Sequence, residues 1–276
     1  MMDEEKRPAA EERTYDLLSR AEQGLVITTR DDQNDFTAFL DAARVARRSG
    51  GRLRLVDTGR FGPFELEWLA EAGADLYTSD EARPNRAELG LLAKACVRGD
   101  AVIAYFHHGI LSGDSEEIPT SPGFLAEAGR DGVDVHLSNR ERARDLAGLA
   151  EIARVCRRAG SRLVYYHHGS LDAGLGDLAR SGGWIHLSDL NLPAGEQGAL
   201  LADIAVKTAA SGSGLVIHLE KGLTVETLHD LLEAGAFVLF KTPPADRRSA
   251  FRALERRARK RTLDRRACYL YPDFLP

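Results

Sequence analysis

The sequence predicts an α/β protein built from repeated βα units, with parallel strands in one sheet. Three observations support this: nine short apolar runs recur along the 276 residues, helical patterns separate them, and the runs alternate between two kinds of ending. Strands that alternate with helices of this length pair in parallel through right-handed crossovers. The repeating unit is a double βα of about fifty residues.

Strands of the first kind begin at a glycine and end in polar residues. They are expected at 24–31 (GLVITTRD), 73–80 (GADLYTSD), 132–139 (GVDVHLSN), 182–189 (GGWIHLSD) and 235–242 (GAFVLFKT). A long helix such as DLAGLAEIARVCRRAG follows most of them, and its basic last turn and closing glycine suit a helix C-terminus. The Ser or Thr and Asp or Asn endings are expected to cap the N-terminus of the following helix.

Strands of the second kind end in glycine. They are expected at 52–59 (RLRLVDTG), 101–109 (AVIAYFHHG), 162–169 (RLVYYHHG) and 215–222 (LVIHLEKG). A short helix such as TVETLHDLLEAG follows most of them. Both faces of these strands are largely apolar, which is typical of parallel strands covered on both sides.

Eight of these units predict a TIM-type (β/α)8 barrel with an extra C-terminal strand and helix, and with a helix at 12–23 over its base. The ninth strand leaves a second architecture open, an open α/β solenoid. We expect a disordered N-terminus at 1–11 and a single α/β repeat domain at 12–276, which includes a basic C-terminal helix and tail at 246–276.

Composition narrows the classes of partner. The N-terminus is polar and no run approaches the roughly 18 apolar residues of a membrane span, so we expect a soluble, cytoplasmic protein with no membrane partner. The net charge of -5 is uneven, because residues 246–266 hold ten Arg or Lys against three Asp or Glu. The total charge disfavours a global nucleic-acid partner. The basic helix is either a solvated cap on the last repeat or a surface for an acidic partner or nucleic acid.

Two further features concern cysteines and the tail. Cys96, Cys156 and Cys268 lack the spacing of a metal or disulfide framework, so we expect buried free thiols. The aromatic tail CYLYPDFLP is expected to pack on the body of the protein or on a second subunit, and the second case would make a homo-oligomer.

The motif HHG ends two strands and is the strongest chemical signal in the sequence. The position two before the closing glycine holds a metal-ligating residue type in all four strands of the second kind: Asp57, His107, His167 and Glu220. If the apolar column one residue earlier faces the helices, this column faces the barrel axis, because side chains alternate along a strand. It would then form one layer at the C-terminal mouth and hold a divalent metal such as zinc, manganese or iron.

The other strands add polar groups to the same mouth. Tyr77, His136 and His186 lie in their expected inward column, and three cations are candidates to bind an anionic group: Arg30, Lys221 and Lys241. His108 and His168 are candidate catalytic acids or bases. These residues predict a metal-dependent hydrolase or lyase that performs hydrolysis or proton abstraction on a small polar or anionic substrate.

The same residues also fit a protein without catalytic activity. Duplication copies residues whether or not they act, and HHG can persist because histidine packs at a strand end and glycine permits the turn. The alternative is therefore an α/β repeat protein that binds a protein or nucleic-acid partner through its strand ends or its basic C-terminal helix. Convergence of the four metal-ligand candidates would distinguish the enzyme from this alternative.

Overall fold

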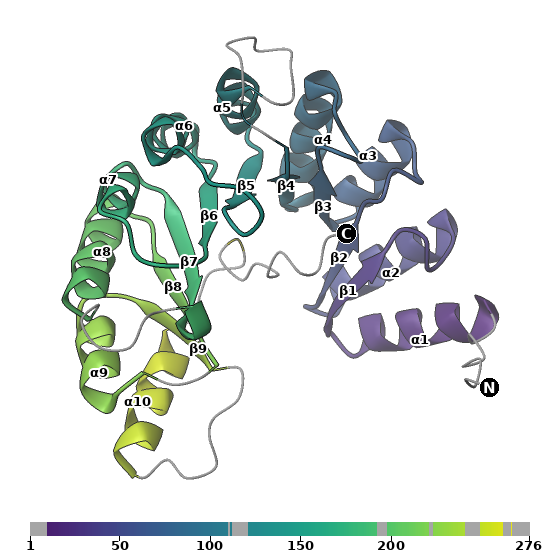
Figure 1. Ribbon diagram of the computed structural model, residues 1–276. Helices are drawn as coiled ribbons and strands as arrows, with labels where there is room; N and C mark the ends of the chain where they lie inside the picture. Colours follow the sequence, from purple (N-terminus) through teal and green to yellow (C-terminus); the bar gives the residue numbers. More distant parts are fainter. Residues whose placement is uncertain are drawn as a thin grey trace, which may run out of the picture. The chain divides into compact units, whose positions relative to one another are not determined.

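The computed structural model describes residues 10–109, 111, 121–191, 198–220, 223–240, 249–261 and 266. Nine parallel strands alternate with helices in one sheet, and the strand order β1 to β9 follows the order of the chain. The predicted α/β fold of repeated βα units is thus confirmed (Figure 1). This sequential order is common to the barrel and to the open array. Within the described segments, no helix has the length and apolar character needed to span a membrane.

The chain divides into two compact units, which we call unit 1 (residues 1–106 and 131–133) and unit 2 (residues 107–130 and 134–276). The elements of unit 1 are α1 (Ala10–Glu22), β1 (Val26–Arg30), α2 (Phe36–Arg48), β2 (Arg52–Val56), α3 (Pro63–Glu71), β3 (Asp75–Ser79), α4 (Arg86–Gly99) and β4 (Ile103–His107), whose last residue belongs to unit 2. Residues 1–9 of the N-terminus that was expected to be disordered lie outside the described residues.

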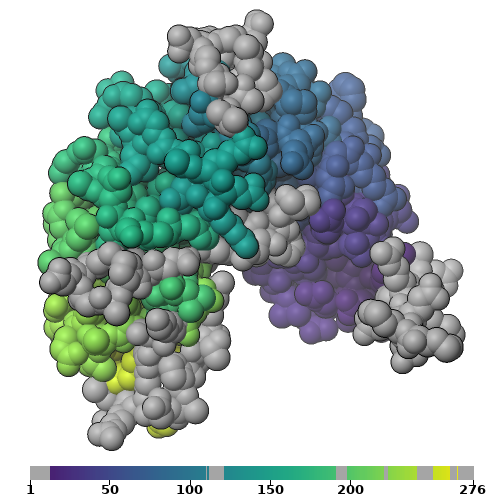
Figure 2. All heavy atoms as spheres, viewed as in Figure 1, coloured from purple at the N-terminus to yellow at the C-terminus, as the bar shows by residue number. Residues whose placement is uncertain are grey.

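Unit 2 continues the same alternation. Its elements are α5 (Pro122–Arg130), β5 (Asp134–Ser138), α6 (Leu146–Ala159), β6 (Leu163–His167), α7 (Gly174–Arg180), β7 (Trp184–Ser188), the 3-10 helix η1 (Asp189–Asn191), α8 (Gly198–Ser211), β8 (Leu215–Leu219), α9 (Val225–Glu233), β9 (Phe237–Phe240) and α10 (Ser249–Lys260). Helices α5 to α9 lie side by side on one face of the strands, and their side chains form a continuous layer over them (Figures 1 and 2).

Helix lengths confirm the double βα repeat. The helices α2, α4, α6 and α8 have 13 or 14 residues, whereas α3, α5, α7 and α9 have 7 or 9. Helix α6 shows how the sequence sets these limits. Its N-cap residue Asp145 accepts hydrogen bonds from the backbone N–H groups of Ala147 and Gly148, and Gly160 ends it in the left-handed conformation with φ of 80°.

The two faces of the unit 2 sheet differ in what they contact. Leu219 of β8 packs with Leu228 and Leu232 of α9, so the side chains in register with Leu219 and with alternate residues before it face the helices. We call this the helix face. On the opposite face, Tyr166 of β6 pairs directly with His186 of β7. Both faces of these strands are buried, as predicted from their apolar pattern.

The sheet of unit 1 also has a helix face and an opposite face, but the residues on its opposite face differ from those of unit 2. Leu53 and Leu55 of β2 are fully buried, and they alternate with Arg52, Arg54 and Val56, which point to the opposite face. Strand β1 is less buried than the strands that follow it, since Val26 is 53% exposed.

The C-terminal elements close unit 2. Phe251, Leu254 and Ala258 of α10 join the apolar cluster of α9, which matches the expected cap on the last repeat. Beyond α10, the Arg266 guanidinium pairs with the buried Asp134 carboxylate at the start of β5. The aromatic tail, and with it the predicted oligomer contact, lies outside the described residues.

The cysteines follow their prediction where the structure describes them. Cys96 and Cys156 are buried thiols that form no disulfide in the described part of the chain. Burial raises the pKa of Cys156 to about 12, which makes this thiol unreactive at neutral pH. Cys268 lies outside the described residues.

Candidate functional site

A row of imidazole and phenol side chains crosses the opposite face of unit 2. The Nδ1 atom of His136 on β5 lies 3.1 Å from the hydroxyl oxygen of Tyr166 on β6. The Tyr166 ring lies 4.9 Å from the ring of His186 on β7, centroid to centroid. The Nδ1 atom of His186 lies 3.2 Å from the Nε2 atom of His218 on β8. Four adjacent strands therefore contribute one side chain each to a continuous polar row.

Burial keeps two imidazoles of this row, those of His136 and His186, uncharged. His136, Tyr166, His186 and His218 are each at most 3% exposed. Burial lowers the pKa of His136 to about 3, with a smaller contribution from the positive charge of Arg162. Burial, together with the neighbouring His218 and His136, also lowers the pKa of His186 well below 6.5. Both rings are neutral at pH 7, so each has one nitrogen that donates and one that accepts.

Polar groups continue from this row to the C-terminal ends of the strands. The Ser188 hydroxyl at the end of β7 donates to a Glu220 carboxylate oxygen at 3.1 Å. His168 and Glu220 each directly follow a strand, β6 and β8, and alternation places both on the face that carries the row. One strand separates them, so their backbones lie on the order of 10 Å apart. Together, His168, Ser188 and Glu220 form a strand-end group above the row.

Side chains from the neighbouring strands hold the backbone of this strand-end group. The Asn139 amide accepts a hydrogen bond from the His168 N–H at 2.6 Å and donates to the His168 carbonyl at 2.9 Å. The Asp189 carboxylate accepts from the Glu220 N–H at 2.7 Å. In unit 1, Asp31 accepts from the Thr58 N–H at 3.0 Å in the same way. The Asp and Asn endings thus hold the next strand, and the prediction that they cap the following helix is wrong for these three positions.

The surroundings of His168 suit a proton acceptor. Its ring is half-buried, and burial lowers its pKa below 6.5, with further contributions from the positive charge of Arg140 and from His167. Arg140 follows β5, where its backbone N–H donates to the Ser138 hydroxyl. A neutral imidazole therefore lies close to a guanidinium that can attract an anionic substrate.

Two members of the predicted metal column, His167 and Glu220, point to different faces of the unit 2 sheet. The pairing of His167 with Leu187, and of Leu187 with Ile217, places His167 on the helix face. Glu220 lies on the opposite face. The sequence pattern places the two residues in one column because both stand two positions before a closing glycine. The register of the strands shows that this alignment is wrong. The assumption that the preceding column faces the helices is also wrong for Tyr166, which lies in the row.

Asp57 and His167 of the predicted metal column each make other hydrogen bonds. The Asp57 carboxylate accepts two hydrogen bonds from the buried Arg83 guanidinium at 2.8 and 3.1 Å, and one from the Thr78 hydroxyl at 2.8 Å. His167 Nε2 lies 2.9 Å from the Ser170 carbonyl oxygen. No group of three or more His, Cys, Asp or Glu residues in the described part of the chain is arranged to hold a metal ion. Within unit 2, His167 and Glu220 do not form the predicted pair of ligands, and the divalent metal itself stays a prediction.

The other predicted residues have mixed placements. Tyr77 lies on the opposite face of unit 1, where its ring stacks on Phe106, and Arg30 pairs with Asp32 at 3.6 Å. The His108 carbonyl accepts a hydrogen bond from Arg144, which also binds the carbonyls of Ser138 and Gly109. His136 and His186 belong to the row. Lys221 and Lys241 lie outside the described residues.

Sequence reasoning left several of the contributing residues without a role in the site. Tyr166 belongs to the column that the sequence analysis treats as apolar, and Arg140, Arg144 and Arg83 are part of no recognised motif. Tyr166 could have been found from alternation alone, because it lies two residues before His168 and therefore on the same side of β6. The arginines lie in loops, whose contacts the strand pattern does not specify.

Comparisons with known proteins identify no family. No family model and no curated protein matches the chain. Among solved structures, it is similar to deoxyribose phosphate aldolase from Aeropyrum pernix, with a TM-score of 0.33, 15% identity and coverage of 90% of this chain and 97% of that one. It is similar at a TM-score of 0.33 to a variant of the citrate synthase SbnG (13% identity; 88% and 96% covered). Methylaspartate ammonia lyase from Clostridium tetanomorphum also gives 0.33 (9% identity; 91% and 56% covered). Similarity at this level transfers no activity to this chain.

Proposed function

We propose that the chain is an enzyme that abstracts a proton from a small polar or anionic molecule at the C-terminal ends of β6, β7 and β8. The observation that carries this proposal is the row of buried imidazole and phenol side chains and its continuation into His168, Ser188 and Glu220. A buried row of this kind provides a dry, uncharged floor on which electrostatic interactions with a substrate are stronger than in water.

His168 is the proposed base. It is neutral at pH 7 because its pKa is lowered, so it can accept a proton from a substrate carbon next to a carbonyl group. The Arg140 guanidinium nearby would balance the negative charge of the substrate. Asn139 fixes the His168 backbone at both its N–H and its carbonyl, which limits the directions in which the ring can point.

Glu220 is the proposed second proton-transfer group. Its carboxylate is held by Ser188, and its backbone by Asp189, on the same face as His168. Two proton-transfer groups separated by one strand leave space for a small molecule between them. A proton taken by His168 on one side of the substrate can therefore be matched by proton transfer at Glu220 on the other.

The test is deuterium incorporation from D2O into small anionic carbonyl compounds, measured by mass spectrometry and NMR. Pyruvate, acetoacetate and dihydroxyacetone phosphate are suitable probes because each has an exchangeable C–H next to a carbonyl. We expect the wild type to accelerate exchange in at least one probe, and the variant carrying His168→Asn and Glu220→Gln to lose roughly 100-fold or more of this rate.

The matched control carries His229→Asn and Glu226→Gln, which change the same residue types at exposed positions of α9. This control should keep the wild-type rate. A wild type that accelerates exchange in none of the probes, or a rate lost equally in both double variants, would contradict the proposal and favour the non-catalytic repeat protein.

A further inference from the structure

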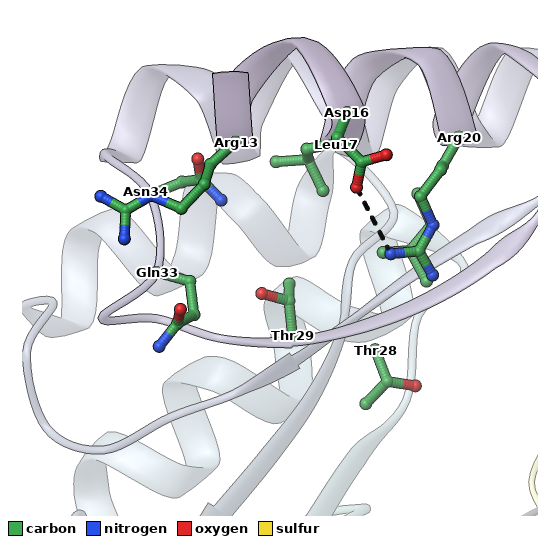
Figure 3. A pocket seen from close by; sticks show the side chains of 9 residues that line it. Arg13, Asp16, Leu17, Arg20, Thr28, Thr29, Gln33 and Asn34 are labelled. Carbon is green, nitrogen blue, oxygen red and sulfur yellow. Dashed lines mark ion pairs between the residues drawn. The ribbon is translucent and has the colours of Figure 1, made fainter. Parts of the chain in front are cut away.

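Unit 1 contains a pocket that the proposed reaction does not use. It has a volume of about 390 Å³ and lies between α1 and β1. Its lining comes from α1, β1 and the loop after β1: Arg13, Asp16, Leu17, Arg20, Ile27, Thr28, Thr29, Gln33 and Asn34. Figure 3 shows the α1 side chains on one wall, and Thr28, Thr29 and Gln33 on the other. Because Thr28 and Thr29 point to opposite faces of the strand, the pocket runs along the edge of β1.

The pocket wall is rich in hydrogen-bond donors. The Nε atom of Arg13 is buried and has no hydrogen-bond partner among the described residues. The Asn34 Oδ1 atom lies 3.3 Å from the Thr14 hydroxyl, which donates to it, so the Asn34 amide nitrogen is directed elsewhere. A buried guanidinium nitrogen is costly to leave without an acceptor. The wall therefore suits a ligand that supplies acceptor oxygens.

The charges of the wall favour an anion. Two arginines and one carboxylate line the pocket. The carboxylate of Asp16 lies 3.8 Å from Arg20, and both side chains of this pair are well exposed, at 69% and 43%. An exposed pair at this distance is weak, so Arg20 can exchange Asp16 for a ligand at little cost. Figure 3 shows the Arg13 side chain extending away from Arg20, so binding of the same oxyanion by both guanidinium groups requires Arg20 to turn from Asp16 toward Arg13.

We propose that this pocket binds a small molecule that carries an oxyanion, a phosphate or a carboxylate. Arg13 and Arg20 bind the oxyanion, since their forked N–H groups match both chemistries. Leu17 and Ile27 contact a short apolar part of the molecule. The volume lies within the range of small-molecule sites. This site is independent of the proposed reaction, because all of its residues belong to unit 1 and those of the strand-end group belong to unit 2.

The test is isothermal titration calorimetry of the full chain at low ionic strength. Inorganic phosphate, butyl phosphate and butanoate are the probes, so that the titrations separate phosphate from carboxylate and measure the apolar contribution. We expect saturable binding of at least one probe, about tenfold weaker in Arg13→Gln and in Arg20→Gln. We expect roughly threefold tighter binding in Asp16→Asn, which removes the competing carboxylate.

The matched controls are Arg180→Gln and Asp177→Asn. These two residues form an exposed pair on one helix, α7, as Arg20 and Asp16 do on α1. Both controls should change the affinity less than about twofold. Absence of saturable binding in the wild type, or equal losses in Arg13→Gln and Arg180→Gln with both variants folded by circular dichroism, would overturn the proposal.

Discussion

The Nδ1 atom of His186 lies 3.2 Å from the Nε2 atom of His218, and both side chains are almost fully buried. One ring donates and the other accepts, so replacing one partner removes the bond and leaves a buried nitrogen on the other. We expect His218→Leu to lower the free energy of unfolding by about 1–3 kcal/mol. Replacing both residues by Leu should cost less than the sum of the single changes. Urea unfolding of the three variants measures this, and strictly additive losses would contradict it.

The buried histidines predict acid sensitivity. His136 titrates at about 3 in the fold, against 6.5 for an ordinary histidine. Between these pH values the unfolded state binds more protons, so stability is present in full above pH 6.5 and declines as the pH falls toward 3. The expected slope is about 1.4 kcal/mol per pH unit for each such histidine. Urea unfolding between pH 7 and pH 4 measures it. The slope should decrease in His136→Asn and remain unchanged in His229→Asn, which alters an exposed histidine.

The Asp57–Arg83 pair predicts a structural role for a residue that the sequence assigned to a metal. Both side chains are buried, and removing the Asp57 charge leaves the Arg83 guanidinium with the more distant Glu88 carboxylate at 3.7 Å. We expect Asp57→Asn to lower the free energy of unfolding by about 3 kcal/mol. Asp16→Asn, which removes one partner of an exposed pair, should cost less than about 1 kcal/mol. A stable Asp57→Asn protein that has lost bound zinc, manganese or iron would contradict this assignment.

Arg144 predicts local order at the first HHG motif. Its guanidinium donates to the carbonyls of Ser138, His107, His108 and Gly109. We expect Arg144→Gln to accelerate amide hydrogen exchange most strongly at 107–109, because the carbonyl groups of this segment lose their hydrogen bonds to the guanidinium group. The measurement is hydrogen–deuterium exchange with peptide resolution. Arg142→Gln, in the same loop, is the control. Equal effects of the two changes would contradict the prediction that the Arg144 hydrogen bonds order this segment.

The repeat and its strands could be predicted from the sequence because alternating apolar runs and glycine-ended helices are local signals. The sheet face on which each strand-end residue lies could not be predicted, because the distance from the closing glycine does not give the strand register reliably. Gly169 follows His168 directly, whereas Lys221 stands between Glu220 and Gly222. The backbone N–H groups of His168 and Glu220 donate to the side chains of Asn139 and Asp189, which shows that His168 and Glu220 occupy the same repeat position. One extra residue after β8 therefore aligned Glu220 with the wrong histidine and moved it to the wrong face.

The candidate site was predictable only in part. His136 and His186 were expected on one face, and the structure places them in the row. His168 was expected as an acid or base, and it remains the proposed base. The hydrogen bonds of the row depend on the stagger between neighbouring strands, which no single strand sequence contains. The same holds for Arg140, whose position near His168 depends on the path of a loop.

The most direct test of the central claim is the pH dependence of deuterium incorporation into the probe that the wild type exchanges fastest. With His168 as the base, the rate should rise with pH to a plateau, with a midpoint below 6.5 because burial and Arg140 lower the pKa of this residue. His168→Asn should abolish both the rate and its pH dependence, and His229→Asn should leave both unchanged. The same midpoint in wild type and His168→Asn would show that another group is the base, and would contradict the account.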